Sequence, residues 1–257
     1  MPANWLGTAK PVEPYSELAG IYDYVMRHVN YGRWAAYLCK LFKKAEGEVS
    51  QILDIACGTG SLLVKFANLG FRVTGFDTSP AMVRMAKAKV LNCDKPVPLW
   101  CGSMMGFGVH SKFDAIICTY DSINYCLKQE AYEATVLHSA QAVRPGGLFI
   151  FDVCTQKNSR MHFKNYYEND GNGEFNYIRQ SFYSPGQNIQ TNEFTITRNS
   201  GAQTSFKEKH QQRIYRISEL LQSIPTDLFD VIGVYDGFSL RAGSEKSERV
   251  HFVLKRF

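Results

Sequence analysis

A glycine-rich turn between an acid and a helix is the part of this 257-residue sequence that is best suited to bind a ligand. In the string Gln51–Ser61, QILDIACGTGS, an apolar run ends in Asp54 and leads into the turn. Gly58 and Gly60 allow the backbone to turn sharply and to approach a ligand without a side chain in the way. The helix expected next directs its N–H groups and positive dipole end at that ligand. The pattern therefore favours a nucleotide-like ligand.

A second acid, Asp77, follows the turn at an informative distance. It stands at the end of the expected strand Phe71–Phe76, about 20 residues after the glycines, where a nucleotide-binding α/β unit places the carboxylate that accepts from both ribose hydroxyls. Thr78 and Ser79 are typical of a helix N-cap, with Pro80 in the first turn. An ordinary strand–helix connection needs no such acid, so the spacing indicates a ribose site.

The glycines do not complete a dinucleotide fingerprint. That pattern, G-x-G-x-x-G, needs a third glycine, and here Gly60 is followed by Ser61-Leu62-Leu63. The string L-D-I-A-C-G-T-G instead resembles the first motif of class I S-adenosylmethionine-dependent methyltransferases, in which the turn wraps the methionine end of the cofactor. The family usually has glycine where this chain has Ala56.

The resemblance implies further cofactor contacts. Met82 would lie near the adenine, and Ser103 replaces an acid that usually bonds the adenine amino group, a bond that a hydroxyl can still accept. The pattern Y-D…R…Y-x-x-W, which starts at Tyr22, looks like the lid helices of glycine-type and amino-sugar N-methyltransferases, and implies that Arg27 pairs with the cofactor carboxylate. The residues so assigned to S-adenosylmethionine, with S-adenosylhomocysteine as product, are Tyr22, Arg27, Trp34, Asp54, Ala56, Gly58, Gly60, Asp77, Thr78, Met82, Ser103, Met104 and Thr119.

The methyl acceptor is expected at the loop after the strand Phe113–Thr119, because ligands of open α/β sheets lie off the carboxyl ends of the strands. The loop string Y-D-S-x-N-Y looks like that of a small-molecule subgroup, and does not resemble the D-P-P-Y string of adenine and glutamine N-methyltransferases. The string E-x-H-x-x-R-x-Y, which starts at Glu208, is similar to the same subgroup. The candidate catalytic residues are Tyr120, Asp121, Asn124, Tyr125, His210 and Arg213.

These candidates also have structural interpretations. Asp121 could orient an amine or act as a base, or it could cap the next segment together with Ser122. Alternation along the expected strand puts His210 and Gln212 on one face and Arg213 on the other, and one of these faces should line the substrate cavity. A lone histidine on a strand is more often structural than catalytic.

The elements that position these residues alternate between strands and helices. This order predicts an α/β fold: a doubly wound, seven-stranded, mostly parallel sheet of the Rossmann-like methyltransferase type, with an antiparallel β insert covering the active site. The expected core elements are strands 51–55, 71–76, 97–101, 113–119 and 148–153, and helices 60–69, 80–90 and 128–143. The string Arg-Pro-Gly-Gly at 144–147 should form the turn before the strand 148–153, and the last strand should be antiparallel.

Three parts of the chain are expected. Residues 1–154 should hold a loose arm (1–14), two lid helices (15–28 and 31–44) and the cofactor-binding core. Residues 155–215 should form the insert, with strands at 177–183, 190–198 and 206–215 and turns at 184–186 and 199–201. Residues 216–257 should complete the core sheet, with a helix at 217–223 and strands at 230–235 and 250–254.

Composition narrows the class of protein. A net charge of +5 from scattered lysines and arginines is no strong footprint for nucleic acid. Seven cysteines without metal-ligand spacing favour reduced thiols in a cytoplasmic protein, and indicate no metal site. The N-terminus has no signal-peptide pattern, and no apolar run is long enough to span a bilayer. We expect a monomer or homodimer that acts on a small molecule.

The sequence therefore predicts a methyltransferase (EC 2.1.1.-) with a small-molecule acceptor, and slightly favours nitrogen. An amine needs only a lone pair, whereas oxygen or carbon usually needs a general base, and no motif decides between them. The alternatives are an O-methyltransferase of a small metabolite, a protein or nucleic-acid methyltransferase, and a cofactor-binding subunit without activity. A NAD-dependent oxidoreductase is disfavoured by the missing third glycine.

Overall fold

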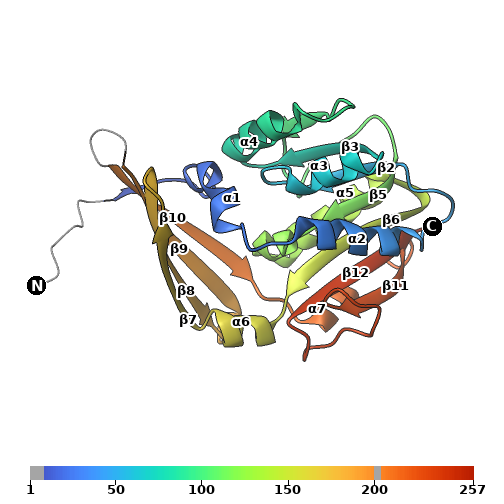
Figure 1. Ribbon diagram of the computed structural model, residues 1–257. Helices are drawn as coiled ribbons and strands as arrows, with labels where there is room; N and C mark the ends of the chain where they lie inside the picture. The colour runs from blue at the N-terminus through green and yellow to red at the C-terminus, as the bar shows by residue number, and fades with distance from the viewer. Residues whose placement is uncertain (1–8, 200–203) are drawn as a thin grey trace, which may run out of the picture.

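The structure is a computed structural model that describes residues 9–199 and 204–257. Figure 1 shows two sheets, a core sheet and a smaller one that faces the carboxyl ends of the core strands. The seven-stranded core sheet consists, in spatial order, of β11 (Phe229–Asp236), β12 (Arg249–Arg256), β6 (Val143–Cys154), β5 (Phe113–Cys118), β2 (Gln51–Ile55), β3 (Arg72–Asp77) and β4 (Leu99–Cys101).

The core sheet has the predicted mixture of directions. The five strands β2 to β6 run parallel to one another, and β12 is antiparallel to both of its neighbours, β6 and β11. The helices of this part are α2 (Tyr31–Phe42), α3 (Ser61–Asn68), α4 (Pro80–Val90), α5 (Gln129–Ala142) and α7 (Ile217–Gln222). The predicted fold, a seven-stranded and mostly parallel sheet with a separate antiparallel insert, is therefore confirmed.

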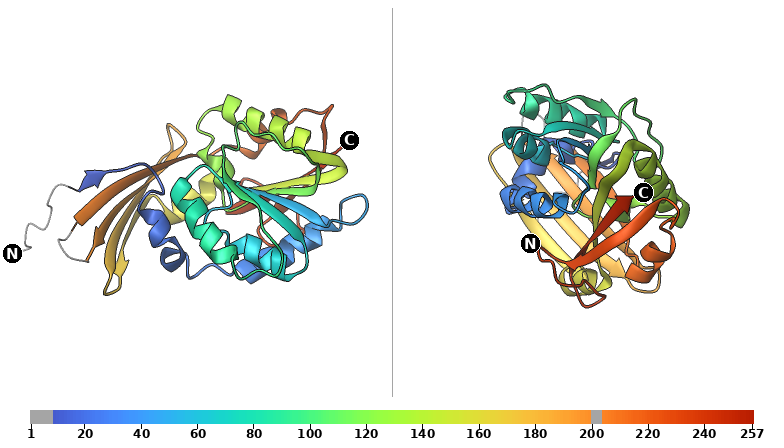
Figure 2. Two further views of the ribbon diagram at one scale, coloured as in Figure 1. Left: turned by 90° about the horizontal axis from the view of Figure 1, so that it is seen from above. Right: turned by 90° about the vertical axis from the view of Figure 1, so that its right-hand side faces the viewer.

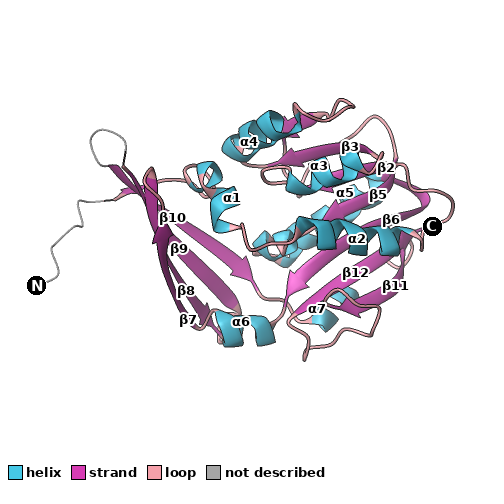
Figure 3. Ribbon diagram, in the orientation of Figure 1, coloured by secondary structure: helices cyan, strands magenta, loops and turns pink. Residues whose placement is uncertain are grey.

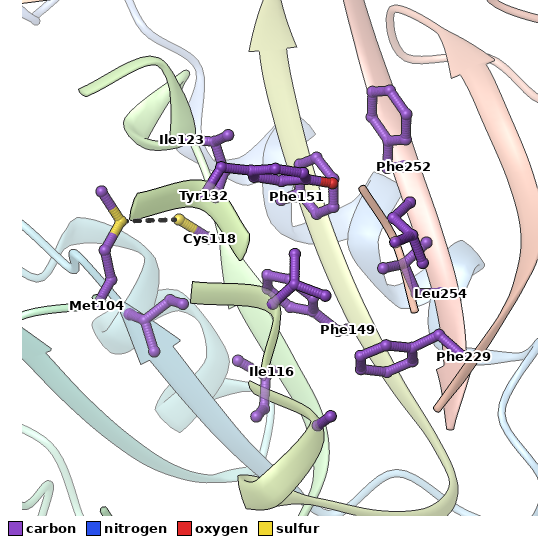
Figure 4. Packing of buried hydrophobic residues seen from close by; sticks show 14 of the residues in the cluster. Met104, Ile116, Cys118, Ile123, Tyr132, Phe149, Phe151, Phe229, Phe252 and Leu254 are labelled. Atoms are coloured by element: carbon purple, nitrogen blue, oxygen red, sulfur yellow. Dashed lines mark hydrogen bonds between the residues drawn. The ribbon is translucent and has the colours of Figure 1, made fainter. Parts of the chain in front are cut away.

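Side chains of β6 fill the core on both faces of the sheet. Phe149 and Phe151 pack in a cluster with Tyr132 of α5, whereas Ile150 belongs to a second cluster with Leu38 of α2. Figure 4 shows the first cluster, in which Phe151 stacks on Phe252 of β12 with the ring centres 4.7 Å apart. Because successive residues of a strand point to opposite faces, a strand covered on both sides must be apolar throughout, as the string LFIFDV nearly is.

The five-stranded sheet, here called the insert sheet, projects from the core (Figure 2). Its spatial order is β1 (Lys10–Pro11), β10 (Thr204–Arg213), β9 (Ile189–Arg198), β8 (Phe175–Ser184) and β7 (Asn165–Gly171). The three strands predicted for the insert correspond to β8, β9 and β10. Helix α6 (Gln156–His162) and strand β7 were not predicted; apart from two tyrosines, β7 consists of polar residues and glycine. Most of the turn predicted at 199–201 lies outside the described residues.

The first predicted lid helix, 15–28, is wrong. The structure has a short 3₁₀ helix (Leu18–Gly20) and one turn of α-helix, α1 (Tyr22–Val25), which Figure 3 shows between the two sheets. The backbone N–H groups of Tyr15, Glu17 and Leu18 donate to the Glu208 carboxylate at 2.7, 2.7 and 2.9 Å. A carboxylate from β10 thus fixes this segment in a non-helical path.

Two other expectations need correction. The predicted loose arm, 1–14, includes Lys10–Pro11, which pairs in parallel with β10, whereas residues 1–8 lie outside the described part. The predicted turn at 144–147 belongs to β6, which begins at Val143. There the Arg144 guanidinium donates to Asp114 of β5 at 2.6 Å, and Gly146 adopts a φ of 72°, so the strand continues through an irregular start.

A buried histidine makes the stability of this fold sensitive to acid. His251 of β12 is fully buried beside Trp34, Tyr37 and Phe238. Burial, and then the nearby Arg249 guanidinium, lower the pKa of His251 to about 3 from the usual 6.5. Below pH 6.5 the histidine is therefore protonated in the unfolded chain but stays neutral in the folded chain. The free energy of unfolding consequently decreases as the pH falls from 6.5 towards 3.

We expect His251→Leu to flatten the pH dependence of the free energy of unfolding in this window, by up to about 1.4 kcal/mol per pH unit. Urea unfolding at several pH values measures the slope. The matched control is His110→Leu at an exposed position, which should keep the wild-type slope. A wild-type slope in His251→Leu would contradict the assignment.

Candidate active site

A cavity of about 1000 Å³ lies between the core sheet and the insert sheet. The glycine turn, which we define as Asp54–Gly60, and the start of α4 form one wall, and residues of β8, β9 and β10 form the opposite wall. The acceptor loop, Tyr120–Tyr125, and the lid segment, Tyr15–Tyr31, close the remaining sides. Of the predicted site residues, those that line the cavity are Tyr22, Asp54, Ala56, Gly58, Asp77, Thr78, Met82, Ser103, Met104, Thr119, Tyr120, Asp121, Tyr125 and His210.

The glycine turn contains three residues in the left-handed region. Ala56, Gly58 and Gly60 have φ values of 61°, 56° and 77°. Glycine adopts this conformation without strain, which is why the family usually has glycine at the position of Ala56. Gly60 does not line the cavity: a Cβ at this position would lie 3.1 Å from the Cβ of Ala86. The cofactor role expected for Gly60 is therefore corrected to close packing between α3 and α4.

Asp77 is held at the mouth of the turn by two backbone donors. Its Oδ2 accepts from Gly58 N and its Oδ1 from Ser79 N, both at 2.9 Å. Burial raises the pKa of Asp77, although these hydrogen bonds lower it in part. A carboxylate has about four lone-pair sites, so these bonds leave acceptor capacity on Asp77, which lines the cavity. Asp77 can therefore accept from a pair of ribose hydroxyls.

Asp54 is more deeply buried than Asp77, and one of its carboxylate oxygens lacks a hydrogen-bond donor within the described residues. It is only 2% exposed, and its Oδ1 is buried with no partner in the described part of the chain. Burial and the neighbouring Asp77 raise the pKa of Asp54 well above its usual range. Burial of a carboxylate costs free energy unless a cation or a hydrogen-bond donor pairs with it. The ammonium group at the methionine end of S-adenosylmethionine is such a partner, so this site fits the cofactor.

Two residues of the pattern that starts at Tyr22 differ from their predicted role. Arg27 does not line the cavity; it pairs with Asp170 of β7 at 2.5 Å and stacks on the Tyr24 ring. Trp34 is buried against Tyr120 and Phe238 and does not line the cavity. The cofactor contacts expected for both are therefore corrected, because tertiary packing gives each side chain another partner.

Another set of contacts, which the sequence did not predict, fastens the lid segment to the glycine turn. Thr59 donates its hydroxyl to Asp23 at 2.7 Å, and the Lys89 ammonium donates to Asp23 at 2.9 Å and to Ser61 at 2.8 Å. These bonds join α1, the glycine turn and α4. They keep the lid segment close to the glycine turn.

The acceptor loop is fixed by a buried aspartate that sequence reasoning missed. Tyr120 and Asp121 adopt positive φ values of 62° and 53°, and their N–H groups donate to the Asp152 carboxylate at 2.6 and 3.0 Å. Asp152 is fully buried, and burial raises its pKa although Arg249 lowers it in part. The acid within the apolar string LFIFDV was a signal for this role.

Asp121 has partners for both of its oxygens. Arg249 donates to Oδ1 at 2.7 Å, and Gln212 donates to Oδ2 at 2.5 Å. Arg249 also forms an ion pair with Asp152. A carboxylate engaged in this way is better suited to positioning the loop than to accepting a proton.

Asn124 and Arg213 do not reach the cavity. Asn124 is fully buried, donates to the carbonyl oxygen of Arg213 at 2.7 Å and accepts from Cys154 N at 3.1 Å. The Arg213 guanidinium stacks on the Tyr215 ring and lies 3.8 Å from Glu219. The catalytic roles expected for both are corrected to structural ones. Alternation along β10 accounts for Arg213, since His210 occupies the other face.

His210 belongs to a chain of hydrogen bonds that runs from Glu208 to Tyr15. Its Nε2 lies 3.0 Å from Glu208 Oε2, and its Nδ1 lies 3.3 Å from the Tyr125 hydroxyl. The Tyr125 hydroxyl is in turn 2.5 Å from that of Tyr15. Burial raises the pKa of Glu208, but hydrogen bonds from His210 and three backbone N–H groups outweigh it and leave this pKa lowered. Glu208 and Tyr15 were not predicted, although alternation puts Glu208 on the same face as His210.

Comparisons with known proteins agree with this site. A family model described as a methyltransferase domain matches residues 52–147. A Geobacillus sp. (strain WCH70) protein, provisionally named a methyltransferase, is 29% identical over 94% of this chain and 99% of its own length. A dTDP-3-amino-3,6-dideoxy-alpha-D-glucopyranose N,N-dimethyltransferase from Streptomyces fradiae is 30% identical over 58% of both chains.

The fold is shared with solved structures. An S-adenosylmethionine-dependent methyltransferase from Clostridium acetobutylicum ATCC 824 superposes with a TM-score of 0.81 at 22% identity, over 94% of this chain and 98% of that one. The architecture and site thus define the class I methyltransferase fold. This chain is a class I S-adenosylmethionine-dependent methyltransferase, with S-adenosylmethionine as its methyl donor. None of its described helices is both long and apolar enough to cross a membrane.

Proposed function

We propose that this enzyme transfers the methyl group to a nitrogen atom of a small molecule. The observation that carries the proposal is the chain of hydrogen bonds that links Glu208, His210, Tyr125 and Tyr15, of which the last three residues line the cavity. The Streptomyces fradiae relative is named for methyl transfer to the nitrogen of an amino sugar, which supports the same type of acceptor here.

An amine acceptor can use this chain, because an amine is mostly protonated near neutral pH and must lose a proton before it has the lone pair that accepts the methyl group. Glu208 stays ionised and can accept the Nε2–H of His210, which leaves the Nδ1 lone pair facing the Tyr125 hydroxyl. Burial raises the pKa values of Tyr125 and Tyr15, so both hydroxyls stay neutral. A proton from the acceptor can therefore pass through a tyrosine hydroxyl to His210, and Glu208 stabilises the resulting imidazolium.

The remaining residues position the two reactants. S-adenosylmethionine, when bound, supplies an activated methyl group on a sulfonium, so orientation can provide much of the rate. Asp54 and Asp77 would hold its ammonium and ribose at one end of the cavity. Asp152 and Arg249 would fix the acceptor loop between this end and the insert sheet.

Isotope transfer tests the type of acceptor. Purified enzyme is incubated with S-adenosylmethionine carrying a deuterated methyl group and a protein-free extract of small metabolites, and the products are fragmented by mass spectrometry. We expect the label on a nitrogen atom. Label on oxygen or carbon would overturn the choice of nitrogen. Label found only after protein or nucleic acid is added would overturn the small-molecule assignment.

A further inference from the structure

The acceptor half of the cavity contains an arginine, Arg179, whose guanidinium stacks among aromatic rings. Arg179 lies on β8, on the same face of the insert sheet as His210. Its guanidinium carbon is 5.1, 5.4 and 5.5 Å from the ring centres of Phe163, Tyr166 and Phe194. Aromatic contacts of this kind hold a guanidinium by its faces and leave its N–H edge for hydrogen bonds.

The hydrogen bonds of Arg179 are incomplete. Its Nη2 donates to the neutral amide oxygen of Asn192 at 3.0 Å, and its Nε is buried with no partner in the described part of the chain. Glu168, directly opposite on β7, accepts from the Tyr177 hydroxyl at 2.8 Å and forms no ion pair with Arg179 within the described residues. Arg179 is half-buried in the cavity wall, and its guanidinium has no ion-pair partner within the described residues.

Another arginine that lines the cavity provides a contrast. Arg249 also stacks on aromatic rings, those of Trp34 and Tyr120, but it forms ion pairs with both Asp121 and Asp152. The guanidinium of Arg179 has the same kind of aromatic surroundings without the carboxylates. An anion that enters the cavity could form the ion pair that Arg179 lacks within the described residues.

We propose that Arg179 and the amide of Asn192 form a subsite for an anionic group on the acceptor, either a carboxylate or a phosphate. A guanidinium binds both groups through its fork of donors. The inference deepens the proposed function and rests on it in one respect: the anion must belong to the molecule that is methylated.

The position of the subsite limits the size of the acceptor. The Phe194 ring lies between the two groups, 5.5 Å from the Arg179 guanidinium carbon and 5.5 Å from the His210 ring centre. Arg179 and His210 are two strands apart, which corresponds to about 10 Å. The acceptor should therefore be a compact molecule with its amine and its anionic group at opposite ends.

Binding of simple anions tests the subsite without knowledge of the acceptor. Enzyme saturated with S-adenosylhomocysteine is titrated calorimetrically with pyrophosphate and, separately, with succinate. We expect at least one of them to bind the wild type, and the preferred one identifies the source as phosphate or carboxylate. Arg179→Met keeps an apolar stem against the rings and should weaken this binding by about tenfold or more, the value of one charged hydrogen bond.

Three further variants sharpen the result. Arg179→Lys keeps the charge but not the fork, and should bind more weakly than the wild type and more tightly than Arg179→Met. Glu168→Gln removes a nearby negative charge and should strengthen binding. Lys207→Gln, on the outer face of β10, removes one positive charge outside the cavity and should have no effect.

Two outcomes would overturn the subsite. One is a wild type that binds neither anion, and the other is equal binding by the wild type and Arg179→Met. Unchanged affinity for S-adenosylhomocysteine in Arg179→Met shows that the fold and the donor end are intact. If the anion binds through Arg179 but deuterated methyl groups never reach nitrogen, the proposed acceptor atom fails and the subsite stands.

Discussion

Replacement of Asp77 by alanine should weaken the binding of S-adenosylhomocysteine by about 100-fold or more, which is the value of two hydrogen bonds to a charged group. The variant would lose the carboxylate that we expect to accept from the ribose hydroxyls. It also loses the bonds from Gly58 N and Ser79 N that tie the glycine turn to the start of α4. Isothermal titration calorimetry of the purified variant measures the effect.

A graded series separates binding from general damage to the fold. Asp77→Asn keeps one acceptor oxygen and should lie between the wild type and Asp77→Ala. Asp94→Ala, at an exposed position before β4, should bind as the wild type does. The ribose assignment is wrong if Asp77→Ala retains wild-type affinity.

Replacement of His210 by glutamine should reduce kcat by about 100-fold or more near neutral pH, a typical contribution of a general base. The affinity for S-adenosylhomocysteine should not change, because His210 lies on the wall opposite the glycine turn. Activity should recover as the pH rises, since a larger fraction of the amine is then deprotonated in solution. A pH profile of the isotope-transfer reaction measures both effects.

The same profile distinguishes a catalytic His210 from a structural one. A purely structural role would lower activity equally at every pH, or would raise KM alone. His110→Gln serves as the control at an exposed position. Wild-type kcat in His210→Gln would exclude His210 as the proton acceptor.

The core of the fold could be predicted because it depends on local patterns. The apolar runs that became β2, β3, β5 and β6, and the turns between them, lie within short stretches of sequence. Asp54 and Asp77 could be singled out because each ends such a strand. The boundaries proposed for the three parts of the chain, 1–154, 155–215 and 216–257, remain a prediction.

The contacts that complete the site depend on residues far apart in the sequence. Arg249 donates to Asp121, which is 128 positions away in the sequence. Glu208 accepts from the backbone N–H group of Tyr15, which is 193 positions away. No local pattern encodes such pairs. The same reason explains why the contact predicted for Arg27 was wrong, since its partner Asp170 lies on a strand that was not predicted.

A crystal structure with S-adenosylhomocysteine tests the arrangement of this active site most directly. We expect the ammonium of the ligand to lie within hydrogen-bonding distance of Asp54 Oδ1, and both ribose hydroxyls to contact Asp77. The sulfur should face the acceptor loop and the wall that carries His210. A ligand with its ribose away from Asp77 and its ammonium in solvent would show that neither carboxylate binds the cofactor.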